Sequence, residues 1–168
     1  LKYVSLQLGA HILKNAGAVD SVNAGVAMLE EKIRTGEGLR KLGEMIRAQG
    51  GDPEVVTDPS RLPLAKKIIE LKADKSGWIT GFHTGDIGNA ARLLGAGRMK
   101  KTDVLDLATG LIMHVRLGDK VNQGDVICEL HTGQTSDVTG AYNLLMRSIL
   151  IGEEKPEPKP LVLGVVEE

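Results

Sequence analysis

The stretch GDPEVVTDPSRLP, from Gly51 to Pro63, divides this chain of 168 residues into two parts of different character. It contains two Asp-Pro pairs and a further proline, and such residues mark turns and end regular elements. Before it, apolar side chains recur at three- and four-residue spacings, as in helices, and after it come short apolar runs typical of strands. We therefore predict a helical segment over residues 1–50, a linker over 51–64 and a mixed module over 65–152.

Three helices are predicted in the first part. The first covers residues 1–16, the second follows the candidate cap residues Asp20 and Ser21 and ends near Gly36, and the third covers residues 38–48. The first two carry apolar stripes wide enough to cover a sheet, and this part of the sequence contains no strand pattern. We therefore expect an exposed apolar helix face and self-association of the isolated chain.

The second part predicts an α+β fold of short, mainly antiparallel strands with two helices. The residue ranges expected for strands are 65–73, 78–82, 104–108, 110–115 and 126–131, and those expected for helices are 84–94 and 135–151. Residues 153–168 are rich in Lys, Glu and Pro at first and should be extended. The apolar run from Leu161 to Val166 could add an edge strand.

Composition argues against several classes of partner. The chain is 42% hydrophobic and 26% charged with a net charge of −1, so nothing draws it to nucleic acid or to an anionic membrane. No apolar run reaches the roughly 18 residues of a membrane span. The single cysteine excludes an internal disulfide framework and suits a reducing, cytoplasmic location. The start at Leu1, inside an apolar pattern, indicates a piece of a longer protein.

The candidate reactive residues have structural interpretations. None of the four histidines has a second ligand at metal-binding spacing, and no serine has the context of an activated nucleophile. The run from Gly95 to Arg98 follows a helix, which indicates a C-cap and not a phosphate-binding loop. Thr84 is a candidate N-cap, and the nearby Asp86 would repel an anion there. Cys128 lies in an apolar strand and is interpreted as a buried thiol.

Residue patterns alone therefore assign no catalytic, substrate-binding, phosphate-binding or metal residue to this chain.

An ordered set of short motifs is a more specific guide to the family of the protein. The motifs are, in chain order, Arg47-Ala48-Gln49-Gly50-Gly51-Asp52-Pro53, Asp58-Pro59, Leu62-Pro63, Lys75-Ser76-Gly77, Leu93-Leu94-Gly95-Ala96-Gly97-Arg98 and Val115-x-x-Gly118-Asp119-Lys120-Val121-x-x-Gly124.

This set resembles the C-terminal half of the thymidine and pyrimidine-nucleoside phosphorylases. The resemblance implies the end of a large α/β domain followed by an α/β-hammerhead-like module that moves as the cleft closes. It also implies a cytoplasmic homodimer that converts a pyrimidine nucleoside and phosphate into a free base and a pentose 1-phosphate. Phosphate is a co-substrate there, and no cofactor is expected in this chain. The family's catalytic groups, including a Lys-His-Ser-Thr-Gly-Gly segment, lie upstream and have no match here, so the nucleoside and phosphate should bind elsewhere.

Two alternatives come from other functional classes. The corner from Val115 to Gly124 also resembles biotinyl and lipoyl carrier domains, with Met99-Lys100 as a superficial attachment site. An increment of cofactor size in the intact mass would identify a carrier. The other alternative is a non-catalytic interaction or scaffold protein that uses the first helix as its partner surface. A native gene that starts near Leu1 would favour the scaffold.

Overall fold

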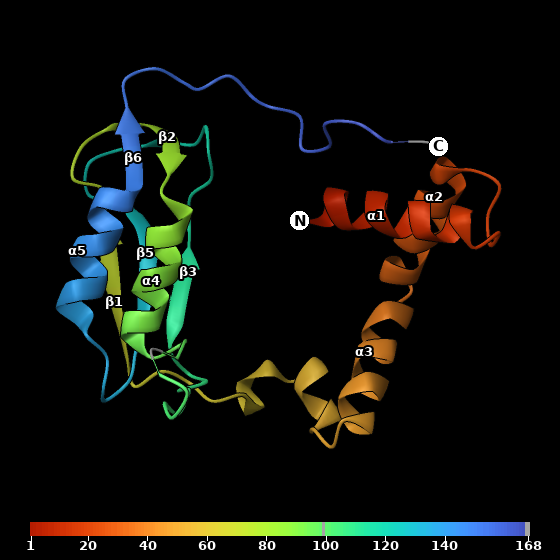
Figure 1. Ribbon diagram of the computed structural model, residues 1–168, viewed down its shortest axis with the longest axis horizontal. Coiled ribbons are helices and arrows are strands. Elements are labelled where there is room, and N and C mark those ends of the chain that lie inside the picture. Colours follow the sequence, from red (N-terminus) through yellow and green to blue (C-terminus); the bar gives the residue numbers. More distant parts are fainter. Residues whose placement is uncertain (99, 167–168) are drawn as a thin grey trace. The chain divides into compact units, whose positions relative to one another are not determined.

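The computed structural model describes residues 1–98 and 100–166, which form two compact units (Figure 1). The helical unit comprises residues 1–61 together with the chain from Lys159 onward, and the mixed unit comprises residues 62–158. Met99 of the carrier hypothesis, and Glu167 and Glu168 at the end of the expected tail, lie outside the described residues.

The helical unit contains α1 (Lys2–Asn15), α2 (Val22–Arg34) and α3 (Glu37–Ala48), as the sequence predicts. The predicted cap is confirmed for α2, because the hydroxyl of Ser21 accepts a hydrogen bond from the backbone N–H of Ala24 at 3.2 Å. Small residues bring α1 and α2 together. A Cβ atom placed on Gly25 would lie only 2.9 Å from the Cα of Ala10, so the two helix backbones are in direct contact.

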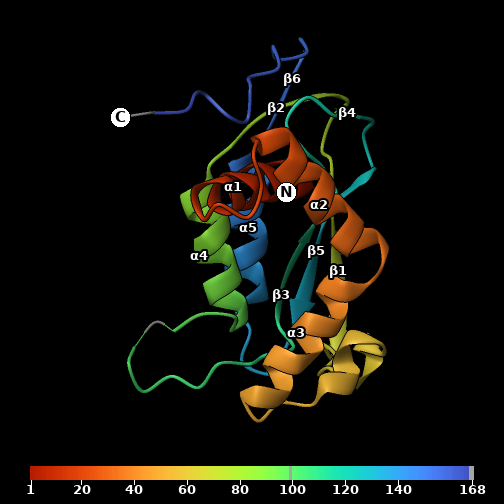
Figure 2. The same cartoon turned by 90° about the vertical axis from the view of Figure 1, so that its right-hand side faces the viewer.

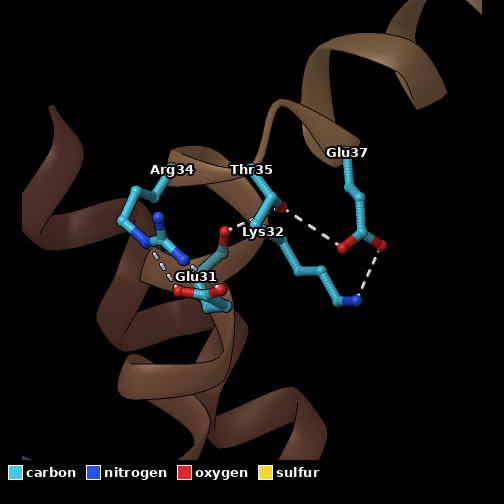
Figure 3. Close-up of polar contacts among 5 residues, drawn as sticks. All are labelled: Glu31, Lys32, Arg34, Thr35 and Glu37. Carbon is cyan, nitrogen blue, oxygen red and sulfur yellow. Dashed lines mark hydrogen bonds and ion pairs between the residues drawn. The ribbon is translucent and has the colours of Figure 1, made fainter.

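Charged side chains secure the turn between α2 and α3 (Figure 3). Lys32 Nζ lies 2.7 Å from Glu37 Oε2, and the hydroxyl of Thr35 donates to the Glu31 carbonyl at 2.9 Å. The hydrogen bond from Lys32 lowers the pKa of the Glu37 carboxyl. The predicted helix end at Gly36 has a φ of 76°, a left-handed conformation that favours glycine.

The predicted linker contains two short 3-10 helices, η1 (Pro53–Val56) and η2 (Pro59–Arg61). The carboxylate of Asp52 joins them: it accepts the backbone N–H of Glu54 at 3.0 Å and pairs with Arg61 Nη2 at 2.7 Å. The hydrogen bond from Glu54, followed by the one from Arg61, holds the pKa of Asp52 below its usual range.

The mixed unit confirms the predicted α+β class. Its elements are β1 (Lys67–Lys72), β2 (Gly77–Phe82), α4 (Thr84–Leu94), β3 (Gly110–Met113), β4 (Lys120–Val121), β5 (Val126–Thr132), α5 (Val138–Ser148) and β6 (Ile149–Gly152). The strands form two antiparallel sheets, in the orders β1-β5-β3 and β4-β2-β6. Figure 2 shows α4 and α5 together on one side of the first sheet. The largest fully buried hydrophobic side chains are Leu71, Ile79, Leu94, Ile127, Leu130 and Leu145.

Four local predictions are wrong. The last predicted helix stops at Ser148, and residues 149–152 form β6 because they pair with β2. Residues 104–108 form no strand, because the carboxylate of Asp106 accepts the N–H of Ala108 at 3.0 Å and turns the chain.

The other two wrong predictions concern the tail and one cap. Residues 161–166 form no edge strand: they have no strand partner, and most of their side chains are exposed. The N-cap of α4 is His83 instead of Thr84, and no side chain caps this helix. The backbone N–H of His83 donates to the Ser148 carbonyl at 2.9 Å, which ties the start of α4 to the end of α5.

Candidate functional site

The outer face of the β1-β5-β3 sheet gathers a carboxylate and two imidazoles. Glu129 and His131 alternate with the buried Leu130 along β5, so both point away from the core. Glu129 Oε1 lies 3.3 Å from His114 Nε2, and Glu129 Oε2 lies 3.4 Å from His131 Nε2. Glu70 of β1 stands directly opposite Glu129 in the register.

This His-Glu-His cluster was not predicted from the sequence, which suggested scattered histidines. Strand alternation could have placed Glu129 and His131 on one face, but the position of His114 depends on the pairing of β3 with β5. The side chains of all three residues are partly exposed. Within residues 1–98 and 100–166, no three His, Cys, Asp or Glu side chains are arranged to hold a metal ion. The cluster can therefore form charge-assisted hydrogen bonds but lacks the geometry of a metal centre.

The remaining two histidines belong to other elements. His11 is on α1, and His83 precedes α4 as its N-cap. The helix that follows has no side-chain cap. The structure does not bring His83 into a cluster with other candidate residues.

The run from Gly95 to Arg98 is a helix C-cap, as predicted. Gly95 has a φ of 109°, and its backbone N–H donates to the Arg92 carbonyl at 3.0 Å. Lys100, the candidate attachment residue of the carrier hypothesis, follows in the loop between α4 and β3 and not at the tip of a hairpin. Its backbone N–H donates to Asp103 Oδ2 at 2.8 Å.

The predicted corner between Val115 and Gly124 is built from two turns, each closed by an aspartate. Asp119 Oδ2 accepts the backbone N–H of Arg116 at 2.6 Å, and Asp125 Oδ2 accepts that of Asn122 at 2.7 Å. The N–H of Gly118 donates to the Ile79 carbonyl at 2.8 Å, which fixes the first turn to β2.

Trp78 lies beside this corner with two lysines over its ring. The Nζ atoms of Lys120 and Lys155 lie 5.8 and 5.2 Å from the ring centroid, within the range of cation–π attraction. Next to Lys155 is an open hollow of about 520 Å³ that continues over Leu117 and Pro156.

Cys128 is fully buried, as predicted. Burial, followed by the charge of Glu129, raises the pKa of its thiol to about 11. The thiol is therefore protonated near neutral pH, and a nucleophilic role is disfavoured. Among the described residues, no helix is long and apolar enough to cross a bilayer.

Comparison with known proteins places these features in a family. Residues 78–152 match the model of the pyrimidine nucleoside phosphorylase C-terminal domain. The chain is 38% identical over 153 residues to the pyrimidine-nucleoside phosphorylases of Staphylococcus aureus strains USA300 and NCTC 8325 / PS 47. The match covers 91% of this chain and 35% of each relative, so the chain spans about a third of the length of these curated relatives.

The matched residues 78–152 lie within the mixed unit, and the longer match takes in most of the helical unit as well. The resemblance stated from the motifs is thereby confirmed. This chain belongs to the pyrimidine-nucleoside phosphorylase family and corresponds to its C-terminal portion.

Proposed function

We propose that this chain is the C-terminal portion of an enzyme that cleaves pyrimidine nucleosides with inorganic phosphate, giving a free base and a pentose 1-phosphate. The observation that carries the proposal is the match of residues 78–152, a segment inside one compact unit, to the C-terminal domain of these phosphorylases. In this proposal the enzyme is a cytoplasmic homodimer, phosphate is a co-substrate, and the chain itself needs no cofactor.

The proposed contribution of this portion is structural support for the cleft and its closure. Phosphorolysis requires a cradle of hydrogen-bond donors for the attacking phosphate and a cation or imidazole near the departing base. We assign those groups to the part of the enzyme that lies outside this chain. The chain itself spans only about a third of the length of its relatives. A rigid module that moves with a larger domain can still govern the rate, because closure excludes water and aligns the reactants.

Exposed apolar side chains on the helices support the proposal that another part of the enzyme packs against them. Tyr3, Leu8 and Ile12 on α1 and Leu42 and Met45 on α3 are all exposed although large and hydrophobic. Such surfaces mark places where another protein element packs. We propose that the remainder of the phosphorylase chain covers them.

The test is release of uracil or thymine from uridine or thymidine in the presence of phosphate. The isolated chain should release no base, and the same chain joined to the remainder of the phosphorylase should release it only when phosphate is added. Base release by the isolated chain would overturn the assignment of catalysis to the missing part. Absence of phosphate-dependent release by the folded, joined protein would overturn the proposed activity.

A further inference from the structure

The first helix, α1, differs from its neighbours in where its charged side chains lie. Among Asp, Glu, Lys and Arg it contains only Lys2 and Lys14, which are at its two ends. By contrast, α3 carries Arg40, Lys41 and Glu44 in its middle. A helix with one side in water normally carries charged residues on that side. The composition of α1 is therefore that of a helix covered on more than one side.

Two apolar stripes run along different sides of α1. One stripe contains the buried Leu6 and Ala10 and packs against α2. The other, here called the free stripe, consists of Val4, Leu8 and Ile12, which are four residues apart and so lie along one line of the helix. Leu8 is two residues from both Leu6 and Ala10, which in an α-helix is roughly half a turn. The contact with α2 therefore leaves the free stripe uncovered.

The free stripe is open to solvent in this chain. Leu8 is 63% exposed and Ile12 is 68% exposed. Residues 161–165 border an open hollow beside Leu8, but most of their own side chains are exposed, so they do not cover it. A line of large aliphatic side chains without a charge marks a surface against which another protein element packs.

We propose that α1 is an internal helix of the complete enzyme, packed between α2 and an uncharged, apolar face of the phosphorylase chain outside these 168 residues. The match covers only 35% of the length of each relative, so most of such an enzyme is available to supply that face. The inference rests on the proposed function, because it takes this chain to be a portion of a longer phosphorylase. It adds that the free stripe is the contact surface.

Thiol labelling tests whether the free stripe is covered. Leu8→Cys and Ile12→Cys should react with a maleimide roughly tenfold more slowly, or slower still, in the protein joined to its remainder than in the isolated chain. Lys14→Cys is the matched control, because it is an exposed position of the same helix off the free stripe, and its rate should be the same in both proteins. Peptide mass spectrometry reads each position separately. Equal rates in both proteins at positions 8 and 12 would overturn the proposal.

Dilution distinguishes the remainder of the chain from a second copy as the occupant. Protection supplied by the same polypeptide should not depend on protein concentration. Protection that disappears when the joined protein is diluted to a monomer would overturn the proposal in favour of a second copy.

Base release by the unaltered joined protein is measured separately. Protection of Leu8→Cys without phosphate-dependent release would support the buried α1 while refuting the proposed activity. Release without protection would refute only the buried α1.

A charge on the free stripe gives a second readout. Leu8→Glu should lower the melting temperature of the joined protein by roughly 5 °C or more, because a carboxylate is costly to bury in an apolar contact. In the isolated chain the same side chain is mostly exposed, so the shift should be small. Lys14→Gln, a change of charge off the free stripe, should shift both proteins little. An equal effect of Leu8→Glu in the two proteins would overturn the proposal.

Discussion

The close backbone contact between α1 and α2 at Gly25 and Ala10 gives a prediction with a defined sign. A Cβ on Gly25 would lie 2.9 Å from both the Cα and the Cβ of Ala10 and 3.1 Å from the Ala10 carbonyl oxygen. Ordinary contacts of a Cβ begin near 3.4 Å, so α1 and α2 must separate by roughly half an ångström to accept Gly25→Ala. The opposing atoms are backbone or a methyl group attached to it, so no flexible side chain can move aside.

The size of the effect follows from two opposing terms. Overpacking of a close contact costs about 1–3 kcal/mol, whereas replacing glycine by alanine inside a helix contributes about 1 kcal/mol of propensity. The net expectation for Gly25→Ala is a loss of about 1–2 kcal/mol. Gly38→Ala in α3 is the matched control, because its Cβ would meet only the Lys32 carbonyl, at an ordinary 3.8 Å. That variant should gain about 0.5–1 kcal/mol.

Urea unfolding followed by far-ultraviolet circular dichroism measures both variants. The single tryptophan, Trp78, belongs to the mixed unit, so its fluorescence reports that unit separately and should keep the same midpoint. The reasoning is refuted if Gly25→Ala is as stable as the unaltered chain, or if both variants shift the helical transition in the same direction.

Two further predictions concern a buried thiol and a helix cap. The pKa of Cys128 is raised from 9.0 to about 11, so the folded state holds the thiol proton more tightly than the unfolded state does. The bound proton therefore stabilises the folded state fully below pH 9, and this stabilisation is lost as the pH rises to 11. Urea unfolding at several pH values should show that the unaltered chain loses roughly 2 kcal/mol more over this range than Cys128→Ala does, and parallel pH profiles would contradict this. Ser21→Ala should cost about 1 kcal/mol because it removes the cap of α2, whereas Thr84→Ala should change the unfolding midpoint little because the Thr84 side chain caps no helix. A larger loss from Thr84→Ala than from Ser21→Ala would contradict the observed capping.

Elements with strong local signals were predictable from the sequence. The start of α2 at Val22 follows from the hydroxyl of Ser21, and the end of α4 follows from Gly95, because caps act over three or four residues of chain. The burial of Cys128 followed equally from the apolar residues around it in β5. These features depend on neighbours in the sequence and need no knowledge of the fold.

The end of α5 was not predictable in this way. The apolar stripe of that helix, which includes Tyr142 and Leu145, continues with Ile149 at helical spacing, so the local pattern favours a longer helix. Ile149 instead pairs with Phe82 of β2, far away in the sequence. The hydrogen bonds and burial supplied by that partner outweigh the local preference.

The sequence by itself determined the helical first part, the α+β class of the second part and, through its motifs, the family, because caps, periodicities and short motifs are local properties. Only the tertiary structure decided the pairing of β6 with β2 and the approach of His114 to Glu129. Each of these joins residues far apart in the chain. Their contact energy depends on the whole fold, since the entropy lost in closing a long loop is recovered only when many such contacts form together.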